Sequence, residues 1–514
     1  MPCSGSRIRR PLRFAIAISF ALAVSAVGLC QQSDTPESAN PTHSAPSGLT
    51  AVAAIQESLI SAIATAEPSV VAIARVRNEV LERQAGGASL PGVLGGPPLR
   101  PTDADFIPNE FGAGVVVGRS GLILTNYHIL GDPQTSSYFV WTRRRPFPAK
   151  ILAADSWYDL AVLRVSAKDL VPIEFGDGRA VRKGQVVLAL GNPQGIARDG
   201  KVSASWGIIS NVLRRAPRVP RRSADPLGRE TIHQYGTLIQ TDAKLNVGFS
   251  GGALVDLRGR MVGLTTSFAA GAGFDSSAGF AIPVDDRFRR VVETLKKGQT
   301  PEYGFLGVSP EPVGLALRQR GVLGARVVDV FPGTPASKAG IRPGDLVTAI
   351  DGHPVFDDDD LIRLVGALPA EAATTLKVVR DFQVSSSPST NRQRAADIEV
   401  VLSKKHLRTL RPQIGQAHAV RSRGIEVDYV TAVADFKEIV DRLDQAGCVV
   451  VLFVDPDSSA WEAGLRAGHL VSHVGSVRVS KPDEFHAALD AVEGVVEMRT
   501  VTSQGLVELR TVSP

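Results

Sequence analysis

The chain is predicted to be mainly β, with two antiparallel β-barrels followed by two smaller α+β modules. Three observations lead to this prediction. Short strand-like runs separated by turns recur from about residue 70 to residue 190, with the spacing typical of antiparallel barrels. One pattern then occurs twice downstream: a short helix ending in Ala-Gly and an apolar residue, followed by a glycine turn into an apolar strand. The length of 514 residues also indicates several domains, because a single core stops growing near about 250–300 residues.

The N-terminus reads as a targeting segment. Four arginines precede an apolar run over residues 14–29, as in a secretory signal. Cleavage after Gly28, retention as a membrane anchor and lipidation at Cys30 are alternatives, and all three place the body of the protein outside the cytoplasm. We therefore assign residues 1–30 to a signal peptide or membrane anchor. Residues 31–48, rich in Ser, Pro, Thr and Asn, are assigned to a flexible linker.

Composition argues against several classes of protein. Hydrophobic residues make up 44% and charged residues 21%, as in soluble globular proteins. A net charge of +5 is too small for this length to indicate nucleic-acid binding. The arginine-rich stretch 213–222 contains two prolines and no aromatic residue for base stacking, so we interpret it as a solvated loop or a sensor for acidic groups. Cys448 is alone in the body, which excludes an internal disulfide there, and its valine neighbours indicate a buried strand residue.

Elements of the first domain follow from periodicity and from chain-breaking residues. Apolar residues at helical spacing predict an amphipathic helix over residues 49–66, which Pro68 ends. Residues 69–74 begin the first barrel strand, and residues 84–108, with Gly-Gly and Pro-Pro pairs, are predicted to be loop. Further strands are expected at 115–117, 151–153, 160–165 and 186–190, a terminal helix at 287–297, and a linker at 298–301.

Three short stretches contain the candidate catalytic residues. Ser250 lies between glycines on a sharp turn ahead of an apolar run, the setting that a serine nucleophile requires. His128 ends an apolar run, and Asp159 opens a strand-like run. A serine hydroxyl needs a histidine to remove its proton, and that histidine needs a carboxylate to fix its tautomer. The amides of Gly248 and Ser250 could point to one spot and stabilise an oxyanion.

These three contexts, in the order His, Asp, Ser, resemble the trypsin-like serine proteases and specifically the HtrA/Deg family. Taken singly, His128 could be a structural core histidine and Asp159 a turn cap, but their shared order and context favour catalysis. Further matching segments are 111–114, 189–195, 239–243 and 279–283, so that the resemblance covers nearly everything after about residue 50. It implies a trypsin-like double barrel over 49–298 and two PDZ domains, over 303–405 and 421–514.

The resemblance implies an extracytoplasmic, periplasmic serine endopeptidase for unfolded or damaged polypeptides, which works through an acyl-enzyme without metal or other cofactor. A homo-trimer or larger homo-oligomer is implied, and the helix at 49–66 fits that role. PDZ domains bind C-terminal peptides by strand addition. Phe305, Leu306, Gly307 and Val308 would form the carboxylate-binding loop of the first PDZ domain.

The pocket for the side chain before the cleaved bond is expected around Lys244, Leu245, Thr265 and Ser267. Leu245 and the small residues nearby suggest an aliphatic side chain, whereas Lys244 would attract an acidic one. The sequence leaves both open.

The chain departs from the family pattern beside the nucleophile. Val247 stands where the family has Arg, and Phe249 stands where it has Asn or Asp. An aromatic side chain here must find an apolar niche, and a β-branched neighbour is stiff. Our hypothesis is that activity is conditional and depends on ligand at the first PDZ domain. The alternative is a catalytically weak or inactive PDZ-containing chaperone or scaffold. In the second PDZ domain, Glu426 would repel a carboxylate, so that a scaffolding role is at least as well supported there as peptide binding.

Overall fold

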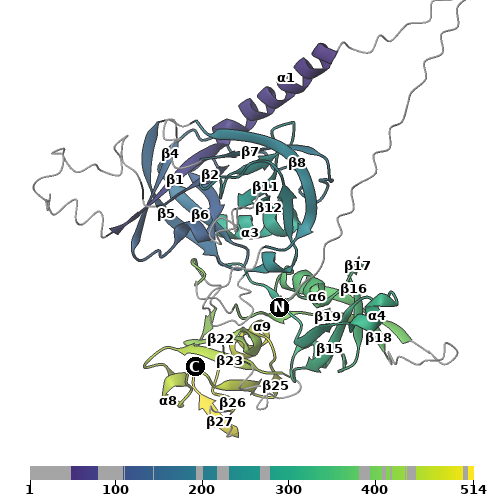
Figure 1. The fold of residues 1–514 in the computed structure, drawn as a ribbon. Helices are drawn as coiled ribbons and strands as arrows, with labels where there is room; N and C mark the ends of the chain where they lie inside the picture. Colours follow the sequence, from purple (N-terminus) through teal and green to yellow (C-terminus); the bar gives the residue numbers. More distant parts are fainter. Residues whose placement is uncertain are drawn as a thin grey trace, which may run out of the picture. The chain divides into compact units, whose positions relative to one another are not determined.

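The computed structural model describes residues 48–78, 108, 110–142, 144–192, 201–216, 231–266, 278–380, 394–407, 412–416, 420–434, 436, 447–501 and 507–514. The predicted leader, nearly all of the 31–48 linker, most of the 84–108 loop, residues 217–222 and Ser267 lie outside these ranges. The strand-rich architecture predicted from the sequence is confirmed over the described residues (Figure 1).

The first barrel forms a closed antiparallel sheet in the order β1-β2-β3-β6-β5-β4. Its strands are mostly buried because each alternates between the barrel interior and the layers packed outside it. Closure leaves no free edge, which removes the hazard of unpaired strands. The strands are β1 (Val70–Arg77), β2 (Glu110–Gly118), β3 (Leu122–Asn126), β4 (Ser136–Thr142), β5 (Arg145–Asp155) and β6 (Leu160–Val165).

The second barrel is also closed, in the order β10-β11-β12-β9-β8-β7. Helix α3 (Asp286–Lys296) follows it, and the side chain of Asp285 caps this helix by accepting from the backbone N–H of Phe288 at 2.8 Å. The strands are β7 (Val186–Gly191), β8 (Ser203–Arg214), β9 (Leu238–Thr241), β10 (Ala253–Val255), β11 (Met261–Thr266) and β12 (Gly279–Pro283).

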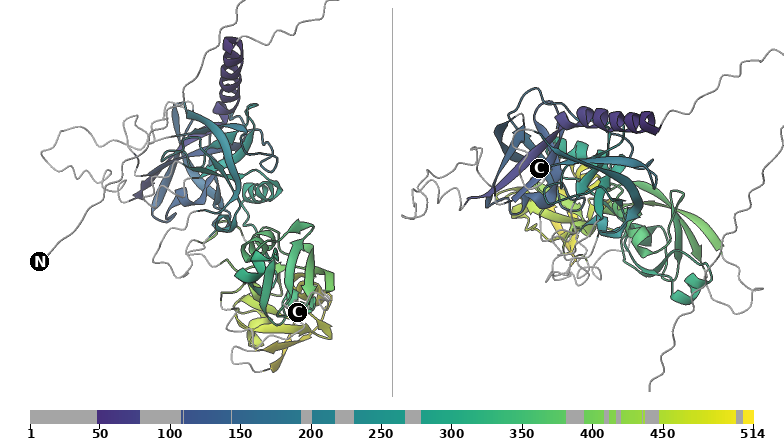
Figure 2. Two further views of the ribbon diagram at one scale, coloured as in Figure 1. Left: turned by 45° about the vertical axis from the view of Figure 1, so that its right-hand side comes forward. Right: turned by 45° about the horizontal axis from the view of Figure 1, so that its top comes forward.

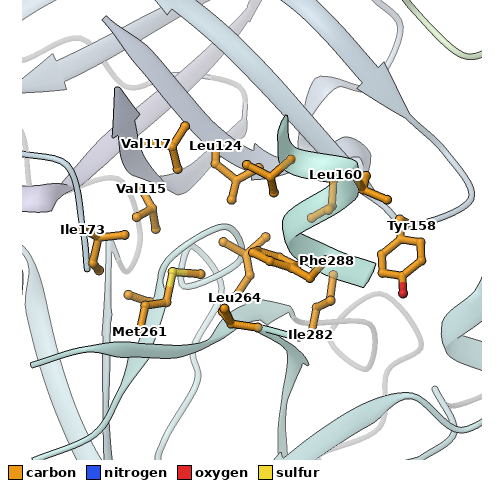
Figure 3. Close-up of a cluster of buried hydrophobic side chains, with 14 of the residues drawn as sticks. Val115, Val117, Leu124, Tyr158, Leu160, Ile173, Met261, Leu264, Ile282 and Phe288 are labelled. Atoms are coloured by element: carbon orange, nitrogen blue, oxygen red, sulfur yellow. The ribbon is translucent and has the colours of Figure 1, made fainter. Parts of the chain in front are cut away.

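One hydrophobic cluster joins both barrels and α3. Leu124 and Leu160 come from the first barrel, Leu264 and Ile282 from the second, and Phe288 from α3. All five are fully buried, and Figure 3 shows their side chains pointing toward one another. The two barrels therefore share a core, and the loops at their junction are held by packing on both sides.

Helix α1 (Gly48–Ala66) agrees with the predicted helix and ends just before Pro68. Ala62 and Ala66 lie in the shared core, whereas Ile55 and Ile60 are 59% and 49% exposed. By length and composition alone, the stretch Gly48–Ser69 is apolar enough to cross a membrane.

The first downstream module has a sheet in the order β14-β15-β16-β18-β19, so that β14 is an edge strand. Helix α6 (Asp358–Gly366) packs beside β14, β15 and β16. Its other elements are β13 (Gly304–Phe305), β14 (Val308–Pro312), α4 (Leu315–Gln319), β15 (Ala325–Val330), α5 (Pro335–Lys338), β16 (Leu346–Ile350), β17 (His353–Pro354), β18 (Ala373–Arg380), β19 (Arg394–Val401) and β20 (Ser403–Lys404).

The second module repeats the pattern in the order β21-β22-β23-β24-β26-β27, and Figure 2 shows both modules, in green and yellow, from two further directions. Cys448 is 7% exposed, which confirms its predicted burial, but it lies just before β23 and not in the strand. The elements are β21 (Arg421–Ser422), β22 (Ile425–Tyr429), β23 (Val449–Val454), α8 (Ser459–Glu462), β24 (Leu470–Val474), β25 (Val477–Arg478), α9 (Pro482–Asp490), β26 (Val496–Val501) and β27 (Val507–Val512).

Candidate active site

The pairing of β3 with β6 brings His128 and Asp159 together. Asn126, the last residue of β3, is opposite Leu160, the first residue of β6. His128 follows β3 on the short helix η2 (Tyr127–Leu130), and Asp159 is the last turn residue before β6. Two residues 31 positions apart in sequence therefore become neighbours through one antiparallel ladder.

The Asp159 carboxylate holds the histidine by two hydrogen bonds. One oxygen, Oδ2, lies 2.8 Å from His128 Nδ1, and the other, Oδ1, accepts from the His128 backbone N–H at 2.9 Å. Asp159 is 3% exposed, so its charge acts in a medium that screens it weakly. The bond to Nδ1 places the proton there, so that Nε2 has the lone pair that a general base needs.

Asp159 has an unusual backbone conformation for a residue with a side chain. Its φ is +54°, in the left-handed region that Asp tolerates better than most residues. Its carbonyl oxygen accepts from the Tyr127 N–H at 3.0 Å and from Asn126 Nδ2 at 3.2 Å. These bonds fix the turn, and with it the direction of the carboxylate.

Ser250 follows a tight turn that only glycine can make. The Phe249 N–H donates to the Asn246 carbonyl at 3.1 Å, and Gly248 has a φ of +101°, as the third position of a type II turn requires. A Cβ on Gly248 would lie 2.1 Å from the carbonyl oxygen of Asn192. The Gly248 carbonyl in turn accepts from the Asn192 N–H at 3.2 Å.

Backbone bonds to both barrels hold the serine beside the histidine element. The Ser250 carbonyl accepts from the Ala113 N–H on β2 at 2.8 Å, and the Gly251 N–H donates to Thr265 on β11 at 2.9 Å. A Cβ built on Gly112 would lie 2.6 Å from Ile129 Cδ1 and 3.3 Å from the Ser250 carbonyl oxygen. Ser250 and Ile129, the residue after His128, therefore both lie next to Gly112.

Phe249 lies in the apolar niche that the sequence requires for it. Its side chain is 3% exposed and belongs to the hydrophobic cluster of the second barrel, with Val187, Ile209 and Leu254. The ring lies against Gly191, where an added Cβ would be 2.7 Å from Phe249 Cδ1. The turn before the serine is thus anchored by apolar packing.

Thr265 also holds this turn, a role that the sequence did not indicate. Its side chain is 0% exposed, and its hydroxyl donates to the Phe249 carbonyl at 2.5 Å. Of the other residues expected near the specificity pocket, Lys244 is exposed, and Leu245 is half-buried against Gly279. Ser267 lies outside the described residues, so the composition of the pocket stays a prediction.

The turn that carries Asp159 is also tied to distant segments through Asp155. This carboxylate is 0% exposed and accepts from the Tyr158 N–H at 3.0 Å, from Gln413 Nε2 at 2.7 Å and from the Tyr303 hydroxyl. Burial raises the pKa of Asp155, while these donors act in the opposite direction by stabilising the charge.

A buried histidine, His233, contacts the backbone of the turn that precedes Asp159. His233 Nε2 lies 2.8 Å from the Tyr158 carbonyl oxygen, and His233 Nδ1 lies 2.6 Å from the Thr237 hydroxyl. Burial lowers the pKa of His233, which favours the neutral ring. This histidine therefore has a structural role, unlike the partly exposed His128.

The residues predicted to capture a carboxylate run from the end of β13, at Phe305, to the first residue of β14, Val308. Gly307 has a φ of +90°, and a Cβ there would lie 2.2 Å from the Thr334 side chain. The Leu306 carbonyl accepts from the Ala336 N–H at 2.8 Å, and the Leu306 side chain is buried. Phe305 and Val308 flank this pair and are half-buried.

The part of the arginine-rich stretch that is described contacts acidic groups. Arg215 forms ion pairs of 2.8 Å with Asp357 and with Asp359, which lie at the start of α6. Carboxylates are stabilised at a helix N-terminus, and Asp357 is the N-cap of α6. In the second module, Glu426 accepts from Arg421 Nε at 3.0 Å, which compensates its charge.

Comparisons with known proteins agree with this domain order. A family model for the trypsin-like peptidase domain matches residues 112–264, and one for the PDZ domain matches residues 326–380 and 450–501. A "Probable periplasmic serine endoprotease DegP-like" from Rhizobium meliloti is 31% identical over 384 residues, which are 73% of this chain and 69% of that protein.

Two other similar proteins have comparable coverage. The protein of the same name from Chlamydia muridarum is 29% identical over 404 residues, 77% of this chain and 72% of that protein. A solved structure, "HtrA-type protease AlgW with tripeptide", has a TM-score of 0.47 and 24% identity, and the match covers 68% of this chain and 97% of that one.

Proposed function

Because the chain belongs to the HtrA/Deg family of serine endoproteases, we propose that His128, Asp159 and Ser250 are its catalytic triad. The observation that supports this assignment most directly is the buried Asp159 carboxylate, which bonds both the ring and the backbone of His128. The second support is the Ser250 turn, held against β2 next to the histidine element.

The proposed reaction is acyl transfer to Ser250. His128 Nε2 takes the proton of the serine hydroxyl as the oxygen attacks a peptide carbonyl, and Asp159 stabilises the imidazolium that forms. The amides of Gly248 and Ser250 stabilise the oxyanion of the tetrahedral intermediate. His128 then gives its proton to the leaving amine, and water hydrolyses the acyl-enzyme by the same steps in reverse order.

Unfolded or damaged polypeptides in the periplasm are the proposed substrates. The relatives are named periplasmic endoproteases, and the arginines and apolar run at the N-terminus fit export. Extended segments of unfolded chains can enter a site between two barrels, whereas folded proteins present few such segments. Since the relatives are named for endoprotease activity, the alternative of a chaperone or scaffold without cleavage is not favoured.

We further propose that the protein is a homo-oligomer, with a trimer expected. Ile55 and Ile60 on α1 are exposed apolar side chains on a helix whose other face packs on the barrels. A second copy would cover them. The Phe305–Val308 loop is proposed to bind C-terminal carboxylates and thereby to regulate the protease, with peptides as partners and no nucleic acid or cofactor involved.

Cleavage of fluorogenic casein by the full chain tests the triad. Ser250→Ala should abolish hydrolysis, whereas Ser166→Ala, at an exposed serine after β6, should leave the rate unchanged. Labelling by a fluorophosphonate, which reacts with activated serines, should be lost in the first variant and kept in the second. Equal casein rates for wild type and Ser250→Ala would refute the assignment and would favour the non-cleaving alternative.

A further inference from the structure

The peptide groove of the first module has an unusual edge. Strand β14 ends the sheet on one side, with α6 beside it and the Phe305–Val308 loop ahead of it. A peptide added to this edge would pair with the backbone groups of β14 that face away from β15. Which residues present those groups decides how much of a peptide the groove can hold.

The direction of each β14 residue follows from one bond at its start. The Gly307 carbonyl accepts from the Phe331 N–H at 2.9 Å, so the backbone of Gly307 faces the β15 side. Successive residues of a strand point their backbone groups to opposite edges. Ser309 and Glu311 therefore also face β15, and the three residues facing the open edge are Val308, Pro310 and Pro312.

Two of these three residues cannot donate a hydrogen bond. Proline has no backbone N–H. Within sheets it is tolerated where the backbone nitrogen faces away from the neighbouring strand, which agrees with the outward orientation of Pro310 and Pro312. The open edge therefore has the N–H of Val308, the last residue of the carboxylate loop, and no donor at the next two outward positions. The carbonyl oxygens of Pro310 and Pro312 remain, but strand addition uses donors and acceptors in alternation.

The second module has a similar strand order without this feature, although β21 pairs with β22 at Glu426 and Ile425, so that only the later part of the β22 edge is open. There the Gly424 carbonyl accepts from the Asp455 N–H at 2.8 Å, in the same way as Gly307 in the first module. The outward positions that follow are Ile425, Val427 and Tyr429, and each has an N–H. The prolines thus distinguish the β14 edge and are not demanded by the fold.

We propose that the first PDZ module recognises the very end of a polypeptide, its terminal carboxylate and last residue, and that Pro310 and Pro312 prevent pairing of the chain upstream. This inference rests on the proposed carboxylate-binding role of the Phe305–Val308 loop. Selectivity for upstream sequence is then low, so that chain ends of many sequences compete for the groove. The acyl-side products of proteolysis, each with a new carboxylate, belong to this class of ligand.

Fluorescence anisotropy with the full-length Ser250→Ala chain, which cannot cleave the probe, tests the proposal. The probes are fluorescein-labelled Ala-Ala-Ala-Ala-Ala-Val, its carboxamide, and labelled Ala-Val with a free carboxylate. We expect the two carboxylate probes to bind with Kd values within about twofold of each other, because little backbone pairing is lost on shortening. The carboxamide should bind at least about tenfold more weakly, because it lacks the charge that the loop amides bind.

Restoring the missing donors should lengthen the recognised segment. Pro310→Ala should tighten binding of the hexapeptide by about fivefold, as one net hydrogen bond contributes. Adding Pro312→Ala should tighten it further. Pro343→Ala, at an exposed proline of the same module, is the matched control and should leave Kd unchanged. Circular dichroism melts of each variant check that the module stays folded.

Each result bears on the proposal. A hexapeptide that binds Ser250→Ala more than tenfold tighter than the dipeptide, or a Pro310→Ala/Pro312→Ala chain that gains nothing, would overturn it. If the carboxylate probes bind neither of these chains, the groove assignment and this inference fail together. Casein hydrolysis by the chain with Ser250 intact, measured in parallel, shows separately whether the protease assignment holds.

Discussion

Gly191 is predicted to affect the activity of the protease through Phe249, the residue before Ser250. Replacing it by alanine adds a Cβ that would lie 2.7 Å from Phe249 Cδ1 and 2.8 Å from Phe249 Cα. Carbon atoms in ordinary contact are about 3.5–4.0 Å apart, so the Phe249 backbone has to move by a good part of an ångström. Because one overlap involves Cα, a change of rotamer cannot relieve it.

The displacement acts directly on the proposed nucleophile, since Phe249 precedes Ser250. Overpacking of this kind costs about 1–3 kcal/mol of folding free energy. A misplacement of about 1 Å at a reacting group can lower the rate of catalysis about a hundredfold. For Gly191→Ala we therefore expect a kcat reduced about 10- to 100-fold, with a smaller change in KM.

Steady-state hydrolysis of an internally quenched peptide, together with fluorophosphonate labelling, measures this effect. Gly494→Ala is the matched control, since a Cβ there would have no neighbour within 4 Å, and it should behave as wild type. Thermal melts separate loss of fold from loss of alignment. A folded Gly191→Ala chain with unchanged kcat would show that Phe249 does not position the serine.

Three further predictions follow from the same contacts. Asp159→Asn should lower kcat by about 10³–10⁴-fold on the same peptide, with little change in KM, because the carboxylate no longer holds the histidine in the required tautomer. An unchanged kcat would show that this carboxylate has no role in catalysis. The buried neutral His233 has a lowered pKa, so the unfolded chain binds the extra proton first as pH falls. The contribution of His233 to folding stability should therefore be fully present above about pH 6.5 and be lost as the pH falls below it. His233→Gln should make the melting temperature fall less between about pH 7.5 and pH 5.5. Parallel profiles for the two chains would contradict this. Ile55→Asp with Ile60→Asp should reduce the mass measured by light scattering to that of a monomer, Glu57→Gln should not, and an unchanged mass would place the oligomer contact elsewhere.

Much of the fold was predictable because it follows local pattern. The helix at 49–66, the strand-like runs of the barrels and the burial of Cys448 are consequences of periodicity and of neighbouring residues. The need of Phe249 for an apolar niche was also evident from its chemistry, and the structure supplies that niche.

What could not be predicted depends on contacts between distant residues. Gly191 and Thr265 lie 58 and 16 positions from Phe249 (249 − 191 and 265 − 249), and no local signal pairs them with it. The partners of Arg215 are more than 140 positions downstream. Pro310 and Pro312 were visible in the sequence, but the edge they face depends on the bond between Gly307 and Phe331.

The Asp155 carboxylate has a practical consequence for anyone who wants the protease domain by itself. A chain that stops at residue 298 would contain both barrels, yet it would lack Tyr303 and Gln413, two of the groups that solvate this buried charge. The carboxylate, four residues from Asp159, would then keep only the backbone N–H groups of Trp157 and Tyr158 as donors among the described residues. In such a shortened enzyme the turn that holds Asp159 would be weakened. Its low rate of hydrolysis would then be mistaken for the effect of a missing activating peptide.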